Sequence, residues 1–265
     1  MGSGGEEEQL LVALQICDTS FPSGSLANSA GLESAIAHGF VNRGVDDESS
    51  KSLLTFFRLT LEQTVRQSLP FVRAAHSAAE LASVEERLSC VMEVDSVCSA
   101  FSVNEVFRRA SLNQGKCFLR AAAAAFAHRA HCASSFETLA EAIRQGKLAG
   151  HYSVVFGVVC GLLGISVQLA ERMLMRCALR DMTSCAARLN VLGPLEGANV
   201  QARLSSEALE LIMLFSPPAL SAPAVPSAKD IVARLLGADM PAQSSPVLDL
   251  LQARHDVLYT RLFSS

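Results

Sequence analysis

Apolar residues recur at three- and four-residue spacing along most of the chain, whereas the strict alternation that marks a half-buried strand is missing from the sequence. In segment 46–67 the apolar residues fall on one side of a helix, and acidic residues gather at its start, where the helix dipole favours them. Pro70 fits the first turn of the next helix, at 68–82. Further helical patterns occupy 6–18, 84–101, about 103–130, 134–147, 168–192, 205–215, 228–237 and 245–265.

Two segments depart from this pattern. Segment 152–167 is the most apolar run, but it is shorter than the roughly 20 residues that a membrane span requires, and Ser and Gly interrupt it. A helix that is apolar on all sides is typical of the centre of a bundle, so we expect this segment in the core. Segment 216–227 is rich in proline, which ends helices.

The pattern as a whole predicts an all-α protein with a single helical bundle of about ten helices. We expect the bundle to occupy residues 9–265, with a proline-rich loop at 216–227, and the first residues, 1–8, to be disordered. Segment 21–34 stands out because it is crowded with Pro, Gly and Ser and carries one charge, Glu33. Residues alone allow two interpretations of this turn, a tight helix–helix corner or a partner surface.

Composition narrows the class of protein. Of the 265 residues, 50% are hydrophobic and 18% are charged, which is typical of a folded chain. The net charge of −4 gives no reason to expect a nucleic-acid partner. The eight cysteines form no C-x-x-C pair, and no secretory signal is visible, so we expect reduced, mostly buried thiols in a cytoplasmic protein with no membrane partner.

Motifs that carry catalytic chemistry are not found. The nearest approach to a phosphate-binding loop, at 110–117, lacks the first glycine and the final hydroxyl and falls within a helical pattern. Ser23 and Ser25 would need a His and an acid to act as nucleophiles, and the sequence singles out neither. We therefore expect a protein that is not an enzyme and holds no cofactor.

The best metal candidate is the cluster at 128–132. His128, His131 and Cys132 could converge if one helix carried them on one face, although a His near a helix end also simply complements the dipole. The many arginines on apolar helices allow two interpretations, a solvated face or a protein interface, where Arg is enriched. They are Arg108, Arg109, Arg120, Arg172, Arg176, Arg180 and Arg188.

The sequence resembles the UreF family of urease accessory proteins. Its N-terminal motif is similar to the family's F-P-x-G followed by S-x-G-L-E, through Phe21, Pro22, Gly24, Ser25, Ser29, Gly31, Leu32 and Glu33. Its end resembles the family's H-e-x-L-Y-x-R-L-F-x-S, through His255, Leu258, Tyr259, Arg261, Leu262, Phe263 and Ser265. Matches between these ends include Arg108, Ser111, Gly115, His151, Gly157, Gly164, Ile165, Arg188 and Gly193.

The resemblance implies an all-α homodimer that bridges a UreH (UreD) accessory protein and the GTPase UreG, delivers nickel to apo-urease and regulates GTP use. Nickel would be cargo of the assembled complex. The resemblance favours partner contact at the turn residues of the first motif, at Arg108, Gly115 and Arg188, and at the tail residues Tyr259, Arg261, Leu262, Phe263 and Ser265. It places Arg172, Leu174, Met175 and Arg176 on a helix that would pack across the dimer. Leu26 and Asn28 depart from the family pattern, which often has aromatic residues or His there.

Alternatives stay open from the residues themselves. The tail carries aromatic and Arg residues, which often anchor interfaces, yet Leu262 and Phe263 could instead fold onto this chain's own core. A helical enzyme using the 21–25 serines or the 128–132 cluster, and a helical scaffold with an unrelated partner, are the rival hypotheses for the whole chain.

Overall fold

The computed structural model describes residues 3–44, 47–216 and 226–265, and its regular structure in those ranges is helical, with no strand. The all-α prediction is confirmed, with slightly more helices than the ten expected. In chain order the helices are α1 (Ser3–Cys17), α2 (Leu32–Ala37), α3 (Asp47–Gln67), α4 (Leu69–Ala79), α5 (Val84–Phe101), α6 (Glu105–Phe126), α7 (Ala130–Arg144), α8 (Tyr152–Leu162), α9 (Val167–Arg188), α10 (Pro194–Leu214), α11 (Ala228–Leu235) and α12 (Pro246–Ala253). Short 3-10 turns lie at Ser25–Ala27 and Arg254–Val257.

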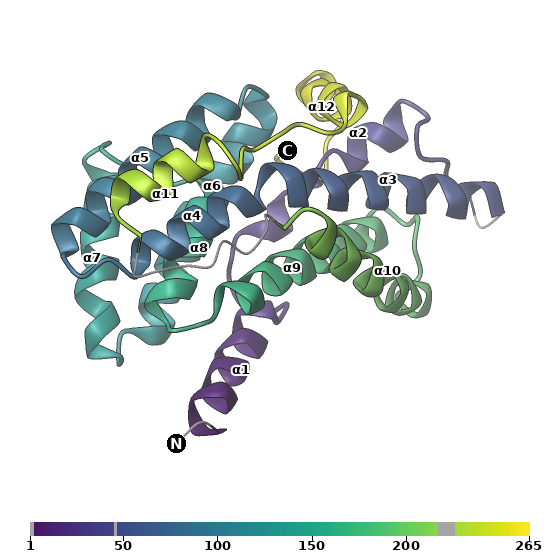
Figure 1. Cartoon of the computed structure of the whole chain (residues 1–265). Helices are drawn as coiled ribbons and strands as arrows, with labels where there is room; N and C mark the ends of the chain where they lie inside the picture. The colour runs from purple at the N-terminus through teal and green to yellow at the C-terminus, as the bar shows by residue number, and fades with distance from the viewer. Residues whose placement is uncertain (1–2, 45–46, 217–225) are drawn as a thin grey trace.

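The centre of the molecule is α8, as its uniformly apolar sequence predicted. Most of its side chains are buried, and it packs along α4 (Figure 1). The two helices approach closely because small residues face each other. A Cβ on Gly157 would lie 2.4 Å from the carbonyl oxygen of Val72, and a Cβ on Gly161 would lie 2.6 Å from Cβ of Ala79. Helices α3, α5, α6, α7, α9 and α11 pack against this pair, and the buried apolar side chains of the chain form one continuous core.

The first helix begins earlier than expected. We predicted disorder for residues 1–8, but α1 starts at Ser3 and residues 1–2 lie outside the described ranges. Glutamates in the first turns of a helix are favoured by its dipole, and Glu8 also pairs with Arg129 at 2.8 Å. In Figure 1 α1 extends beyond the other helices, with the N-terminus at its far end, while its C-terminal part packs on α9.

Other boundaries also differ from the pattern. Helix α7 begins at Ala130, several residues before the expected start, and α10 begins at Pro194 rather than near residue 205. The predicted loop at 216–227 falls mostly on residues 217–225, outside the described ranges, between the end of α10 and the start of α11. Among the described helices, none is long and apolar enough to span a membrane.

Candidate partner-binding site

The turn at 21–34 is a tight corner between helices rather than a projecting loop. Gly24 and Gly31 adopt left-handed φ angles of 78° and 87°, which glycine tolerates without strain. Phe21 is buried and packs on Phe118, with the ring centroids 5.9 Å apart, and Leu32 has no exposed surface. The residues alone left open whether this turn is an internal corner or a partner surface. The internal corner explains why most side chains of the motif are buried.

A buried arginine of α9 fastens the residues that lead into this turn. The guanidinium of Arg180 donates to the carbonyl oxygens of Cys17 at 3.0 Å and Asp18 at 2.9 Å, and its side chain is 5% exposed. The Asp181 carboxylate pairs with the same guanidinium at 2.7 Å. The sequence shows this arginine only as one of many charges on apolar helices, so its role at the turn could not be read from spacing.

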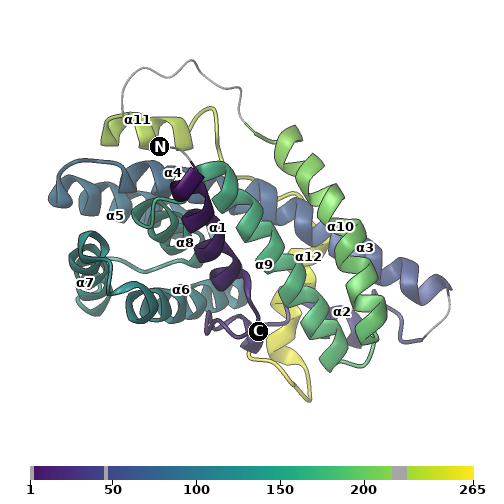
Figure 2. The ribbon, with the colours of Figure 1, turned by 90° about the horizontal axis from the view of Figure 1, so that it is seen from below.

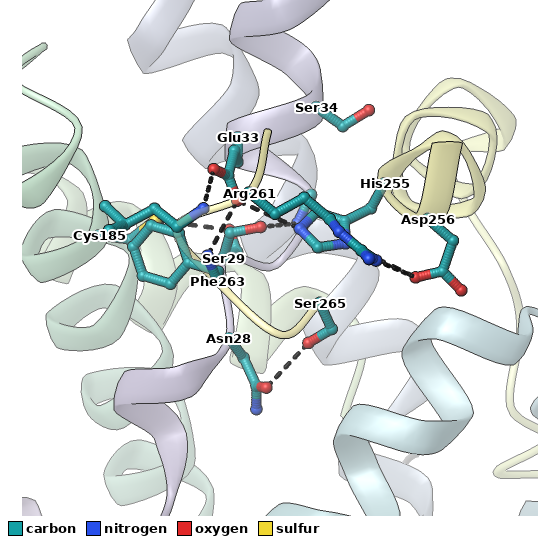
Figure 3. A network of polar contacts seen from close by, with 12 residues as sticks. Asn28, Ser29, Glu33, Ser34, Cys185, His255, Asp256, Arg261, Phe263 and Ser265 are labelled. Atoms are coloured by element: carbon teal, nitrogen blue, oxygen red, sulfur yellow. Dashed lines mark hydrogen bonds and ion pairs between the residues drawn. The ribbon is translucent and has the colours of Figure 1, made fainter. Parts of the chain in front are cut away.

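Glu33 joins the turn to the C-terminal tail, which is residues 258–265 (Figure 3). Its carboxylate accepts hydrogen bonds from the backbone N–H groups of Leu262 at 2.6 Å and Phe263 at 3.1 Å. The Nε2 atom of His255, a ring with no exposed surface, lies 3.2 Å from the same carboxylate. One carboxylate thus fixes the backbone of the tail, because charged acceptors make the stronger hydrogen bonds.

Backbone hydrogen bonds hold the last residues against the turn. The N–H of Ser29 donates to the carbonyl oxygen of Ser265 at 2.6 Å, and the N–H of Ser264 donates to Ala27 at 2.8 Å. The hydroxyl of Ser265 donates to the Asn28 side chain at 2.8 Å. Asn28, which departs from the family pattern, is therefore used here to anchor the chain's last residue.

Phe263 is the apolar anchor of the tail. Its side chain is 6% exposed, and the guanidinium of Arg188 lies over its ring, 4.4 Å from the centroid. Arg188 also donates to the carbonyl oxygen of Leu26 at 2.6 Å, so one side chain covers the tail and holds the turn. Phe263 and Ser265 are both buried within this chain, so they offer no exposed side chain to a partner, contrary to the prediction for these two residues.

The outer side of the tail faces solvent. Tyr259 is fully exposed and Leu262 is 62% exposed. Arg261 and Arg109 both reach Asp256, at 3.2 Å and 2.7 Å, and the hydrogen bond from Arg109 holds the pKa of Asp256 below its usual range. The tail therefore presents an aromatic, an apolar and a cationic side chain on a backbone that is held in place.

The other predicted interface residues divide by burial. Arg108, Arg172 and Arg176 are exposed, whereas Gly115 is buried where α6 crosses the chain before α8. Leu174 and Met175 are 3% and 2% exposed. They face inward from α9 into the chain's own core, so the prediction that they form a dimer surface is wrong.

The histidine–cysteine cluster does not form the arrangement that its spacing suggested. Helix α6 ends at Phe126 and α7 begins at Ala130, so a helix junction splits the cluster. His128 is exposed, whereas Cys132 has no exposed surface and its thiol donates to the carbonyl oxygen of Leu162 at 3.0 Å. The side chain of His131 lies outside the described part. No group of three potential metal ligands occurs among the side chains that are described.

A cavity of about 160 Å³ lies beneath the turn. The turn, α3, α6, α8 and α9 line it with hydroxyl, amide and apolar side chains, including Ser25, Tyr152 and Cys177. Burial raises the pKa of Tyr152, and burial is also the main cause that raises the pKa of Asp181. This cavity could not be predicted from the sequence, because its walls come from segments far apart in the chain.

Comparison with known proteins identifies the family. The sequence model of the UreF family matches residues 48–205, which is more than half of the chain. The chain belongs to the UreF family. A urease accessory protein F of Oryza sativa is 30% identical to this UreF chain over 250 residues, covering 94% of this chain and 82% of the rice protein.

Relatives named for the same family occur in other plants and in bacteria. Urease accessory protein F of Arabidopsis thaliana is 29% identical over 252 residues, covering 95% of this chain and 90% of the relative. Urease accessory protein UreF of Paenarthrobacter aurescens is 27% identical over 255 residues, covering 96% of this chain and 97% of the relative. These matches extend over more than nine tenths of the chain, whereas the family model, at 48–205, ends before the tail and begins after the turn.

Proposed function

We propose that this chain is a non-enzymatic urease accessory protein that acts by binding other proteins during urease maturation. It bridges a UreH/UreD-type accessory protein and a UreG-type GTPase, so that nickel, the cargo of the assembly, reaches apo-urease. The GTPase supplies the nucleotide chemistry, and this chain changes how that GTP is used. The proposal rests first on membership of the UreF family and on the names of relatives that match almost the whole chain.

The observation that carries the binding role is the tail held on the turn. Tyr259, Arg261 and Leu262 are exposed, and hydrogen bonds to Glu33 and Ser29 hold the backbone that follows, at Leu262, Phe263 and Ser265. Aromatic and Arg side chains dominate the energetics of many interfaces. A surface that is ordered before binding loses less conformational entropy when the partner arrives, which favours affinity.

Sequential capture with purified proteins tests the bridge. The full chain is immobilised and offered the UreH/UreD-type protein, then the UreG-type GTPase with GTP and nickel. We expect capture of the first partner, and retention of the GTPase by the assembled surface. If this chain retains neither protein, the proposed function is wrong.

A nucleotide titration tests the non-enzymatic part. The sequence has two Gly-Lys pairs, Gly115-Lys116 inside α6 and Gly146-Lys147 just after α7. A phosphate-binding loop also needs a glycine five residues before the glycine of the pair and a Ser or Thr after the lysine, and neither pair has them. A fluorescent GTP analogue is therefore expected to show no saturable binding to the isolated chain. A micromolar site, or GTP hydrolysis by this chain alone, would contradict the proposal.

A further inference from the structure

Two cysteines from distant parts of the chain meet beside the turn. Cys17 is the last residue of α1 and Cys177 lies near the middle of α9, and the Cys177 thiol donates a hydrogen bond to the sulfur of Cys17 across 3.9 Å. They are free thiols. Two segments 160 residues apart in sequence thus bring their sulfur atoms near van der Waals contact.

The charges around this pair distinguish its two members. The hydrogen bond from Cys177 lowers the pKa of Cys17, and the guanidinium groups of Arg180 and Arg176 lower it further, against the effects of burial and of the Asp181 carboxylate. The same hydrogen bond, together with burial, raises the pKa of Cys177. Since the thiolate is the reactive form of cysteine, Cys17 is the better nucleophile and Cys177 the natural second thiol.

Both cysteines lie where a small oxidant can come close. Cys17 is partly exposed at the point where α1 meets the turn. Cys177 is buried, but it lines the cavity of about 160 Å³ beneath the turn, which has room for molecules of the size of water. By contrast, Cys90, Cys98, Cys132, Cys160 and Cys185 are buried, and Cys132 donates to a backbone carbonyl instead.

We propose that Cys17 and Cys177 form a peroxide-sensitive dithiol that closes to an intramolecular disulfide. The Cys17 thiolate attacks one oxygen of hydrogen peroxide, the O–O bond breaks, and the departing hydroxide takes up a proton as water. The sulfur of Cys177 loses its proton and attacks the resulting sulfenic acid, forming the S–S bond while the S–O bond breaks and a second water leaves. Two thiols are oxidised and one peroxide is reduced to two waters.

Closure requires the sulfur atoms to approach from 3.9 Å to about 2.05 Å. The movement is available to Cys17 because it ends its helix and is followed by the turn at 18–21, whereas Cys177 is fixed inside α9. The disulfide ties the last turn of α1 to α9 at the place where Arg180 already holds the carbonyl oxygens of Cys17 and Asp18. Oxidation therefore stiffens the start of the turn that holds the tail.

Thiol mapping of the full-length protein tests this site. The fully reduced chain is treated with a few equivalents of hydrogen peroxide, remaining thiols are alkylated, and non-reduced peptides are analysed by mass spectrometry. We expect a Cys17–Cys177 linked peptide lighter by two hydrogens than the two reduced peptides, in a chain that remains of single-chain mass and returns to dithiol with dithiothreitol. The oxidised protein should melt several degrees higher than the reduced protein, because a cross-link across so long a loop restricts the unfolded chain.

Variants separate this site from general oxidation. Cys17→Ser should abolish the link, and Cys177→Ser should leave a sulfenic acid at Cys17 that dimedone traps. Because Cys177 is buried and its variant could fold poorly, the partly exposed Cys17 provides the decisive loss. Cys117→Ser, at another partly exposed cysteine, is the matched control and should leave the link unchanged. Oxidation of Cys117 while Cys17 stays reduced, or a link that forms only between two chains, would overturn the proposal.

Discussion

Glu33 is the residue on which the arrangement of the tail depends most directly. Its side chain is 11% exposed and its carboxylate faces three donors, two backbone N–H groups of the tail and the ring of His255. Burial of a carboxylate is tolerated when hydrogen bonds replace its water, and here those bonds also define where the tail lies. The same position supplies the one charge in the otherwise uncharged turn.

Replacement of Glu33 by Gln should release the tail. The amide offers one acceptor oxygen without charge and brings an N–H₂ group toward the backbone N–H donors of Leu262 and Phe263, so a bond worth about 1–3 kcal/mol is lost. We expect the thermal midpoint to fall by several degrees and amide hydrogen exchange to accelerate across residues 258–265. Glu137→Gln, at an exposed position on α7, is the matched control. Unchanged exchange in the tail would mean that Phe263 and Ser265 suffice to hold it.

Glu33 also shows what can be predicted about a single residue from the sequence: that the position is unusual, but not which groups it contacts. A lone charge in a stretch of small residues identified the position as unusual, and the resemblance to the UreF family gave it weight. Its partners lie more than 220 residues away in sequence, at 229 and 230 positions for the two tail amides, so no local pattern could identify them. The same limit applies to Arg180, which looks like other helical arginines until the turn is folded against it.

At the scale of elements, the tail divides into side chains that are buried in the chain's own structure and side chains that are exposed to solvent. Phe263 and Ser265 belong to the chain's own structure, whereas Tyr259, Arg261 and Leu262 are exposed. The reason is that hydrogen bonds hold the backbone of the tail against the turn, so that from Leu262 to Ser265 the side chains alternate between exposed and buried positions. A free C-terminus frays unless it is tied down, and here both its backbone and its last aromatic side chain are tied.

Two changes in the tail should therefore behave differently. Deletion after Thr260 removes Phe263 and should lower the thermal midpoint by several degrees, since loss of a buried Phe side chain typically costs about 3–5 kcal/mol. Arg261→Ala removes an exposed ion pair, worth about 1 kcal/mol or less, and should leave the midpoint nearly unchanged while weakening capture of the UreH/UreD-type partner. A normal melt together with full-strength capture for Arg261→Ala would remove Arg261 from the proposed surface.

The crossing of α6 with the chain before α8 gives a second prediction about an element. A Cβ on Gly115 would lie 2.1 Å from the carbonyl oxygen of Gly150, so Gly115→Ala should destabilise the protein by about 1–3 kcal/mol through overpacking. Gly197 lies inside α10, where an added Cβ meets Leu192 at an ordinary 3.5 Å. Gly197→Ala should instead be neutral or stabilise the chain by about 0.5–1 kcal/mol, because Ala favours the helix. Equal effects in urea unfolding would contradict this interpretation.

The helices themselves were predictable, and their ends were less so. Periodicity identified α3, α5 and α8 because each buries one face or all of its surface, a property that the local sequence carries. The start of α7 was misplaced because Arg129, which precedes it, lacks a capping side chain, and the cluster at 128–132 looked like the end of one helix. Asp95 shows the same limit in packing: its carboxylate accepts the N–H groups of Ala149, Gly150 and His151, a contact that needs the fold to exist.

At the scale of the whole molecule, one face remains incompletely covered. Seen from below, α9 lies between α1 and α10 (Figure 2), and Arg176 of α9 reaches Gln201 of α10 at 2.7 Å. On α1 the inner residues Val12, Ala13 and Ile16 are buried. Its outer residues Leu10, Leu11 and Leu14 are 52%, 68% and 60% exposed. A helix that is apolar on both sides is typical of one that is buried on both sides, so this face suits the homodimer that the family resemblance implies.

Leu11→Glu should therefore convert the proposed homodimer to a monomer of 28.2 kDa while leaving the thermal midpoint of the monomer nearly unchanged. The physical reason is that a charge placed in an apolar contact must be desolvated, whereas in the free chain it stays in water. Leu195→Glu on α10, at a side chain 89% exposed, is the matched control and should keep the dimer mass. Leu174→Ala completes the set, because a buried Leu on α9 should cost about 2–5 kcal/mol of stability through its cavity and leave the partner face intact. Light scattering across the micromolar range measures the mass of all three variants, and thermal melting measures their midpoints. A wild-type chain that is monomeric throughout this range would exclude the dimer. A Leu174→Ala variant that melts normally but is monomeric would mean that Leu174 lies in the dimer interface, which contradicts its burial in the core.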